Sequence, residues 1–404
     1  DIYSDKKTST TTTVADYIVR DGCLKKEKIE MKILLLGGTG ILSSAVCDLA
    51  LKKGMNVTTV NRGKRKEFLR DQADNIVADI RNESVDLLKE KICFQYYDVV
   101  VDFISYTKEQ LTKTISIIEN SCEQLIFISS ATVYKKLDDA HIYIEDDSID
   151  NDKWKYCIEK AECERFLNEG KWSFKFSIVR PYITYGKTRI PFQIVPLKYY
   201  TLLNRIKNNK PILFVDKKAI CTLTNVNDFA VGVVGLFNNP NAYGEAYHIT
   251  SNYCYTWKNV FEIIERAMGE DSKAIEIPLS DLSKIHNLGF EIEELYGDKA
   301  RNMRFDNSKI KTAVNEYQGN ISFEEGIKES ILFFDNPKHQ IIDYIWEGRV
   351  DRIINIYSKK HNLYLKSDLK LNKEKISFVN KIKYYIGRYE VLYLPAKWIK
   401  GIYR

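Results

Sequence analysis

The 404 residues contain no apolar run that approaches the roughly eighteen residues of a membrane-spanning helix. Nothing resembles a secretory signal either, so we expect an intracellular, cytoplasmic protein. The eight cysteines include no CxxC pair and are too sparse for a disulfide scaffold, so we expect free thiols. The five histidines lack metal-ligand spacing, and no metal site is indicated. With 44% hydrophobic and 29% charged residues, the chain is typical of a globular protein of two domains, or of one large domain with additions.

The net charge of +6 is unevenly distributed along the sequence. From Lys359 to the end, twelve Lys or Arg stand against three Asp or Glu, a local balance of +9 that leaves about −3 for the rest. This tail interleaves cations with aromatic residues. The composition suits packing or oligomer contact first, an anionic membrane surface second, and single-stranded nucleic acid least.

Short apolar runs alternate with helical stretches from Met31 onward, which is the pattern of βαβ units. The predicted strands are 32–36, 56–60, 75–78, 99–103, 125–129 and 174–179, with a further short strand at 246–250. The predicted helices are 41–53, 85–91, 108–120, 156–168 and 256–268. We therefore predict an α/β fold, a Rossmann-type doubly wound parallel sheet whose ligands bind beyond the carboxyl ends of the strands, near Gly37, Asn61, Phe103 and Ser130.

Four segments follow from this pattern. Residues 1–30 are an N-terminal appendage to which we assign no chemistry, and residues 31–186 are the cofactor-binding sheet domain, to which 219–250 contribute. Residues 187–340 form a smaller, mixed α/β C-terminal substrate-binding region. Residues 341–404 are a C-terminal extension, basic and aromatic from 359.

A glycine-rich turn, Gly37-Gly38-Thr39-Gly40-Ile41-Leu42-Ser43, joins the first predicted strand to the first predicted helix. In that context Gly37 permits a tight turn, and Gly40 lets the backbone approach a pyrophosphate at the helix N-terminus. Ser43 stands where a third glycine is usual, and its small size makes it compatible. The turn predicts a dinucleotide site.

The residues after the second strand, Asn61-Arg62-Gly63-Lys64-Arg65, indicate which dinucleotide binds. An acid at this point would bind the two ribose hydroxyls of NAD, whereas Arg62 can pair with a 2′-phosphate. The stretch favours NADP as cofactor. Two alternatives remain: the cofactor is NAD, or the basic turn is only solvated and binds no phosphate.

Tyr156 and Lys160 lie four residues apart on a predicted helix and so share a face. The same spacing recurs elsewhere by chance, but only this pair follows the fifth strand, which ends at Ser130. A phenol is a poor base at neutral pH and needs an adjacent cation, which Lys160 and an oxidised nicotinamide would provide. Tyr156 could then move the proton of a substrate hydroxyl that Ser130 binds.

Taken together, these motifs resemble the extended short-chain dehydrogenase/reductase family, specifically the NAD-dependent epimerase/dehydratase group and its UDP-galactose 4-epimerase-like members. The resemblance covers about Met31 to Ser358. It implies that Ser130, Tyr156 and Lys160 are catalytic. It also implies cofactor contacts from Gly37, Thr39, Gly40, Ile41, Leu42, Asn61, Arg62, Asp79, Ile80, Phe103, Lys160, Arg180 and Pro181.

The sequence departs from the family pattern at two kinds of position. Dehydratases carry an Asp-Glu pair after the catalytic hydroxyl residue, where this chain has Ala131-Thr132, so dehydration is disfavoured. Two arginines that clamp the diphosphate of nucleotide-sugar substrates align with Cys221 and Leu295. The candidate substitutes are Lys217, Lys218, Arg301 and Arg304.

We therefore expect an NAD(P)-dependent epimerase or reductase acting on a sugar, one linked to a nucleotide, in surface-polysaccharide or glycan biosynthesis. The resemblance also implies a homodimer through the helices at 108–120 and 156–168. The alternative is a family-derived binding protein that uses its tail on RNA or a membrane surface, since chloroplast stem-loop RNA-binding proteins resemble the same family; nucleic acid is the less favoured partner.

Overall fold

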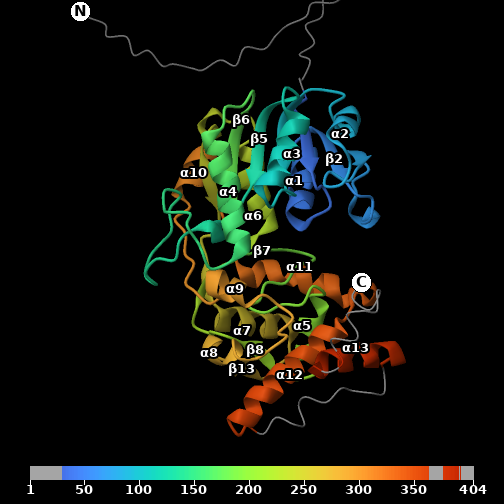
Figure 1. The fold of residues 1–404 in the computed structure, drawn as a ribbon, viewed down its shortest axis with the longest axis vertical. Coiled ribbons are helices and arrows are strands. Elements are labelled where there is room, and N and C mark those ends of the chain that lie inside the picture. The colour runs from blue at the N-terminus through green and yellow to red at the C-terminus, as the bar shows by residue number, and fades with distance from the viewer. Residues whose placement is uncertain (1–29, 364–375, 391, 393–404) are drawn as a thin grey trace, which may run out of the picture.

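Seven parallel strands form the central sheet of the computed structural model, which describes residues 30–363, 376–390 and 392 (Figure 1). Their order across the sheet is β11-β6-β5-β4-β1-β2-β3. The bounds are β1 Lys32–Leu36, β2 Asn56–Asn61, β3 Asp74–Val77, β4 Tyr97–Asp102, β5 Cys122–Ile128, β6 Lys175–Pro181 and β11 Ala246–Ile249. The predicted α/β doubly wound sheet is thereby confirmed, with one strand more than the six assigned to it from the sequence. The seventh strand, β11, is the short strand predicted at 246–250, in the segment expected to contribute to this domain, and it pairs in parallel with β6 at the edge of the sheet.

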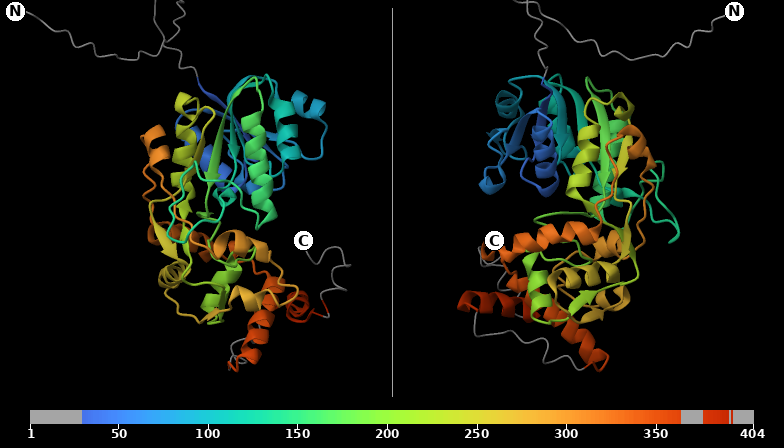
Figure 2. Two further views of the ribbon diagram at one scale, coloured as in Figure 1. Left: turned by 60° about the vertical axis from the view of Figure 1, so that its left-hand side comes forward. Right: turned by 180° about the vertical axis from the view of Figure 1, so that it is seen from behind.

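Side chains of the inner strands alternate between two apolar layers, as a sheet covered on both faces requires. On β1, Ile33 and Leu35 join the layer under α1, α6 and α10, while Leu34 and Leu36 join the layer under α2, α3 and α4. These helices span Ile41–Lys52 (α1), Val85–Ile92 (α2), Lys108–Ile118 (α3), Lys155–Glu169 (α4), Val226–Gly235 (α6) and Ser308–Ala313 (α10). Figure 2 shows helices on both faces of the sheet.

A smaller mixed α/β half lies beyond the carboxyl ends of the strands (Figures 1 and 2). Its helices are α5 Tyr200–Lys207, α7 Trp257–Met268, α8 Leu279–Leu282, α9 Ile292–Glu294 and α11 Phe323–Asp335. Three two-stranded sheets pair β7 (Thr184–Tyr185) with β10 (Thr224–Asn225), β8 (Ile212–Phe214) with β13 (Ala274–Glu276), and β9 (Ile220–Thr222) with β12 (Cys254–Thr256). None of the helices within the described parts of the chain is long and apolar enough to cross a bilayer.

Two helices of the expected C-terminal extension, α12 (Tyr344–Lys360) and α13 (Phe378–Arg388), pack against this smaller half. Trp346, Val350, Ile353 and Ile354 of α12 enter an apolar cluster with Leu213, on β8. The extension is thus integral with the second half at least through α12. The N-terminal appendage up to residue 29, and the tail residues 364–375, 391 and 393–404, lie outside the described residues.

Candidate active site

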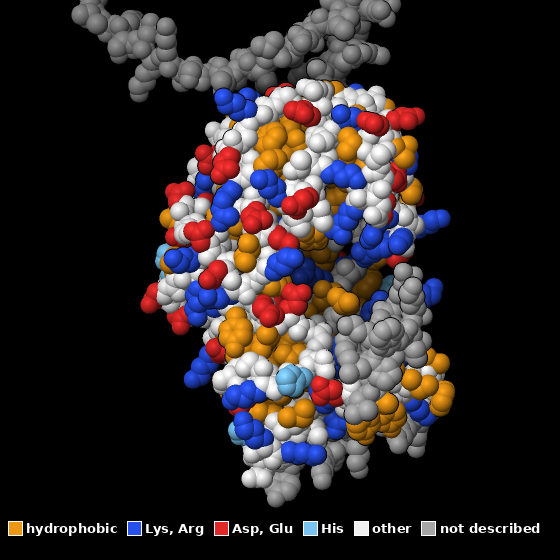
Figure 3. Space-filling model, in the orientation of Figure 1, with side chains coloured by type: hydrophobic (Ala, Val, Ile, Leu, Met, Phe, Trp, Pro, Cys, Tyr) orange, Lys and Arg blue, Asp and Glu red, His pale blue; other side chains and the backbone are white. Residues whose placement is uncertain are grey.

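A cavity of about 620 Å³ opens between the two halves, at the carboxyl ends of the parallel strands. Figure 3 shows the hollow from outside, with Lys and Arg side chains along its upper edge. Gly37, Asn61, Phe103 and Ser130, which follow or end four strands of the sheet, all line it. The structure therefore brings together the strand ends that the sequence places at a common edge.

The glycine turn forms one wall of the cavity and is closed by Ser43. The hydroxyl of Ser43 donates to the carbonyl of Gly37 at 2.6 Å and accepts the amide of Gly40 at 2.9 Å. Gly37 has a φ of +98°, a left-handed conformation that favours glycine. Ile41 and Leu42 begin α1 and line the cavity, so the first amides of this helix, which have no partner within it, point toward the space.

The end of β2 forms a second wall that carries cations and a free amide. Asn61 accepts the amide of Gly63 at 2.9 Å, whereas its buried Nδ2 has no hydrogen-bond partner among the described residues. Arg62 and Arg65 are exposed and line the cavity. A dinucleotide fits here, because an orphaned donor, two guanidinium groups and a helix N-terminus all face one space.

Asp79 and Ile80 follow β3 and also line the cavity. The carboxylate of Asp79 accepts the amide of Arg81 at 3.1 Å and the side-chain amide of Asn82 at 2.9 Å. These bonds, led by that from Asn82, lower the pKa of Asp79, so the group is ionised at neutral pH.

Tyr156 stands at the start of α4 between two other aromatic rings. Its ring centroid lies 4.7 Å from that of Trp154 and 6.1 Å from that of Tyr106. Ser130, two residues after the end of β5, shares a hydrogen bond of 2.8 Å with the hydroxyl of Thr132. Tyr156, Ser130 and Thr132 all line the cavity, so three hydroxyl groups face one volume.

Lys160 lies one helical turn beyond Tyr156 and is buried. Its ammonium donates to the carbonyls of Ser105 and Ile128, both at 2.7 Å, and lies 4.8 Å from the ring centroid of Tyr106. The lysine thus joins the ends of β4 and β5 while still lining the cavity.

Burial is the largest influence on the pKa values of Lys160 and Tyr156. It lowers the pKa of Lys160 to about 8, an effect that the nearby Asp102 carboxylate opposes. Burial also raises the pKa of Tyr156, against the opposing effects of the Ser130 hydroxyl and the Arg189 guanidinium. At neutral pH the phenol of Tyr156 is therefore protonated and the amine of Lys160 is mostly cationic, and both residues line the cavity.

Arg180, expected from the resemblance to contact the cofactor, does not line the cavity, although Pro181 does. Its guanidinium is buried and donates to the carboxylate of Glu164 on α4, with a shortest distance of 2.6 Å. It also donates to the hydroxyl of Tyr134 at 2.9 Å. Arg180 thus fixes β6 to α4, and its side chain lies outside the lining of the cavity.

The second half contributes residues that the sequence argument did not single out. Arg189 lines the cavity, as does Lys299, whose ammonium pairs with Glu294 at 2.6 Å. Asp298 also lines it and is buried, which raises its pKa to about 6. Trp154, from the sheet half just before α4, lines the cavity too and donates its indole N–H to Glu291 at 2.6 Å.

None of the four cations considered as substitutes for the missing arginines lines this cavity in the described structure. Lys217 pairs with Glu276 at 3.4 Å, and Arg304 donates to the carbonyl of Asp139 at 2.6 Å. Arg301 donates to the hydroxyl of Tyr143, also at 2.6 Å. Cys221 and Leu295, which replace the arginines, are buried.

The fold and the glycine turn define an α/β protein of Rossmann type. Residues 33–250 match the NAD dependent epimerase/dehydratase family, and the chain belongs to that family. The expected membership is thus confirmed.

Curated relatives and solved structures are similar to this chain over different lengths. The chloroplast stem-loop binding protein of 41 kDa b of Arabidopsis thaliana is 26% identical over 59% of this chain, a match that spans 64% of the relative's own length. UDP-N-acetyl-alpha-D-glucosaminuronate decarboxylase of Bacillus cytotoxicus is 22% identical over 76% of this chain and 98% of its own.

Among solved structures, the Thermus thermophilus UDP-glucose 4-epimerase complex with NAD has a TM-score of 0.61 at 15% identity, over 76% of this chain and all of the other. The Bacillus cereus UDP-glucuronic acid 4-epimerase in complex with UDP-glucuronic acid and NAD has a TM-score of 0.56 at 18% identity, over 76% of this chain and 99% of the other.

Proposed function

We propose that this protein is an NAD(P)-dependent epimerase or reductase of a nucleotide-linked sugar in surface-polysaccharide or glycan biosynthesis. The proposal rests on one observation: Ser130, Tyr156 and Lys160 line the same cavity as the glycine turn. The decarboxylase and epimerases that the chain resembles are named for UDP-sugars, which supports this substrate class. One relative is named for stem-loop binding, but a complete set of hydroxyl, phenol and ammonium groups favours chemistry over binding alone.

The cofactor would lie along the sheet edge. The amides of Ile41 and Leu42 would hold the pyrophosphate, Asn61 and Arg62 the adenosine ribose, and Lys160 the nicotinamide ribose. We propose NADP over NAD, because Arg62 and its neighbour Arg65 face the cavity with no acid between them. Bound nicotinamide would supply the redox chemistry, accepting a hydride from the carbinol carbon or returning one.

Tyr156 would move the proton of the reacting oxygen. In the reductive direction its phenol donates a proton to the ketone oxygen, and in the oxidative direction the phenolate accepts one from the carbinol. Burial raises the pKa of Tyr156, so the side chain holds its proton at neutral pH and is able to donate it. Ser130 and Thr132 would hold the same oxygen by hydrogen bonds.

The anionic part of the substrate would lie on the side of the second half. Arg189 and Lys299 are the cations that this half presents to the cavity within the described residues, and we propose that they bind the diphosphate or another acidic group. Lys299 already has Glu294 as a partner, so Arg189 is the principal candidate.

We further propose a homodimer through α3 and α4, which pack side by side on one outer face. Light scattering of the purified protein would measure its mass in solution. A monomeric mass at all concentrations would contradict the dimer without affecting the catalytic proposal.

The function is tested by supplying purified protein with NADPH and candidate UDP-4-keto sugars, and in parallel with NAD and UDP-hexoses. Reduction consumes the absorbance of the reduced nicotinamide, whereas epimerisation changes the sugar with no net change in that absorbance. Absence of both signals over the whole panel would remove the proposal.

A further inference from the structure

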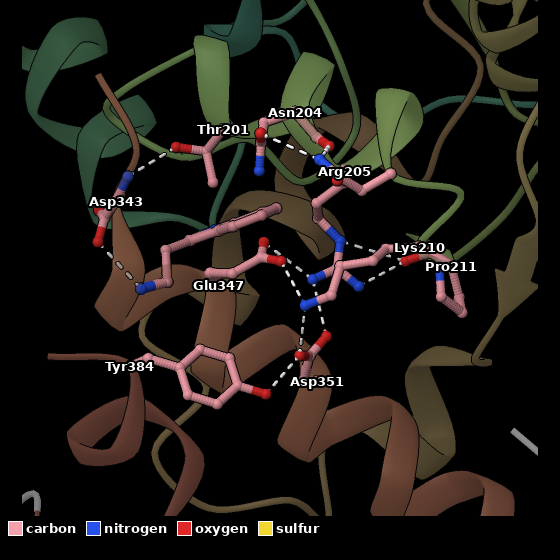
Figure 4. Close-up of polar contacts among 11 residues, drawn as sticks. Thr201, Asn204, Arg205, Lys210, Pro211, Asp343, Glu347, Asp351 and Tyr384 are labelled. Atoms are coloured by element: carbon pink, nitrogen blue, oxygen red, sulfur yellow. Dashed lines mark hydrogen bonds and ion pairs between the residues drawn. The ribbon is translucent and has the colours of Figure 1, made fainter. Parts of the chain in front are cut away.

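A buried charge network attaches the C-terminal helices to the second half (Figure 4). Arg205 of α5 pairs with Asp351 at 2.8 Å and with Glu347 at 2.9 Å, both on α12. Lys210 pairs with the same two carboxylates, at 2.7 and 2.6 Å. The hydroxyl of Tyr384, on α13, donates to Asp351 at 2.7 Å. One network therefore links α5, α12 and α13.

The two C-terminal helices cross at glycines, which leaves little freedom in how α13 is turned. A Cβ on Gly348 of α12 would overlap the carbonyl oxygen of Tyr384, and one on Gly387 of α13 would overlap the carbonyl oxygen of Ile345. The backbones touch at this crossing, so any larger residue would separate the helices. Together with the charge network, this contact fixes which face of α13 points outward.

The outward face of α13 is apolar. Phe378, Val379 and Ile382 are 76%, 59% and 41% exposed, and Tyr389 and Leu392, just beyond the helix, are 54% and 43% exposed. Phe378, Ile382 and Tyr389 follow a helical spacing and lie on one stripe. Figure 3 shows hydrophobic side chains gathered over this end of the molecule. Such a stripe is costly in water and marks an interaction surface.

Lysines border the stripe on both sides. Lys381 and Lys383 are half-buried at the edges of the helix. The one acid between residues 376 and 392, Glu390, is directed at the body, where it accepts the side-chain amide of Asn287 at 2.5 Å and lies 3.6 Å from Arg352. The outward surface therefore combines apolar side chains with lysines that have no acidic partner among the described residues.

We propose that α13 docks this protein on an anionic lipid surface, with the apolar stripe at the acyl boundary and the lysines at the headgroups. This combination is that of an interfacial helix lying in the membrane plane. A second copy of the chain fits less well, because pairing two stripes would bring four of these lysine ammonium groups together. The sequence at 393–404 adds three cations and no acid, which increases the attraction to anionic lipid.

Flotation of the full-length protein with vesicles tests this inference independently of any enzymatic activity. The vesicles are phosphatidylcholine alone, or phosphatidylcholine with phosphatidylglycerol. We expect binding to the anionic vesicles, weakened by salt, and little binding to the neutral ones. Failure to float with anionic vesicles, or equal flotation with both, would overturn the inference.

A matched pair of variants identifies the surface. Phe378→Asp places an acid on the stripe. Leu332→Asp is the control: Leu332 lies on α11 and is 72% exposed, close to the 76% of Phe378. Phe378→Asp should weaken vesicle binding by roughly tenfold or more, because one membrane-buried ring is lost and a negative charge is added. Leu332→Asp should bind as the wild type does. Equal loss of vesicle binding in both variants would refute docking on lipid. So would a wild-type protein that binds no vesicles and forms a dimer that Phe378→Asp, but not Leu332→Asp, dissociates.

Discussion

Replacing Arg180 with leucine should destabilise the fold and leave cofactor affinity largely unchanged. The guanidinium donates to Glu164 at 2.6, 3.1 and 3.2 Å, to the hydroxyl of Tyr134 at 2.9 Å and to the carbonyl of Glu145 at 2.9 Å. Glu164 has no exposed surface, and Ser129 is its other hydrogen-bond donor among the described residues. Removing the arginine leaves a buried carboxylate without its counter-charge, at a cost of about 3–5 kcal/mol.

Thermal unfolding measures this cost. With an unfolding entropy of about 2.1 cal/mol/K per residue over 404 residues, each kcal/mol lowers the Tm by about 1.2 °C, so the loss corresponds to a Tm lower by roughly 4–6 °C. The double variant Arg180→Leu with Glu164→Leu removes the stranded charge and should recover at least about half of the deficit. NADPH affinity, measured by fluorescence titration, should stay within about twofold, because this side chain does not line the cavity. A nearly unchanged Tm with NADPH affinity lowered tenfold or more would refute the reasoning and restore Arg180 as a cofactor contact.

Three further predictions concern the cofactor site and the C-terminal helices. Arg62→Ala should weaken NADPH binding by about tenfold and leave NADH binding unchanged, as titration with each would show; equal effects on both would contradict a 2′-phosphate contact. Burial lowers the pKa of Lys160 to about 8, so its ammonium is charged below that pH and neutral above it. NADPH affinity should therefore fall, by at most about tenfold per pH unit, as the pH rises through this value, and a flat profile would argue against a charged contact. Asp351→Ala removes a partner of two buried cations and should cost about 3–5 kcal/mol in thermal unfolding, whereas a loss below about 1 kcal/mol would mean that the network contributes little.

The sequence was sufficient to predict the parts of the site that depend on local order along the chain. Gly37 and Gly40 are predictable because a turn between a strand and a helix has its own chemistry. Ser130, Tyr156 and Lys160 reach one cavity because parallel strands end at one edge and a helix repeats about every four residues.

Contacts between distant segments were not predictable in the same way. Arg180 is next to Pro181, but its side chain points to the other face of the strand, and the partner that decides its role, Glu164, lies on a helix. β11 joins the sheet after a long excursion through the second half, so its pairing with β6 has no local signal.

The substrate-facing residues of the second half were missed for the same reason. Arg189 and Lys299 are far apart in the sequence, and the fold brings them to the same cavity. A signal was present for Arg189, which closely follows Tyr185-Gly186 near the sheet domain. Tyr106, which follows the fourth strand, could likewise have been found by its position at the sheet edge.

The measurement that tests the central proposal most directly compares Tyr156→Phe with Tyr253→Phe on an accepted sugar substrate. Tyr253 is an exposed tyrosine outside the cavity and serves as the matched control. Loss of the phenolic proton donor should lower kcat by roughly 10²–10⁴ in Tyr156→Phe with NADPH affinity retained, while Tyr253→Phe keeps wild-type rates. Equal turnover in the two variants would contradict the assignment of Tyr156 to proton transfer.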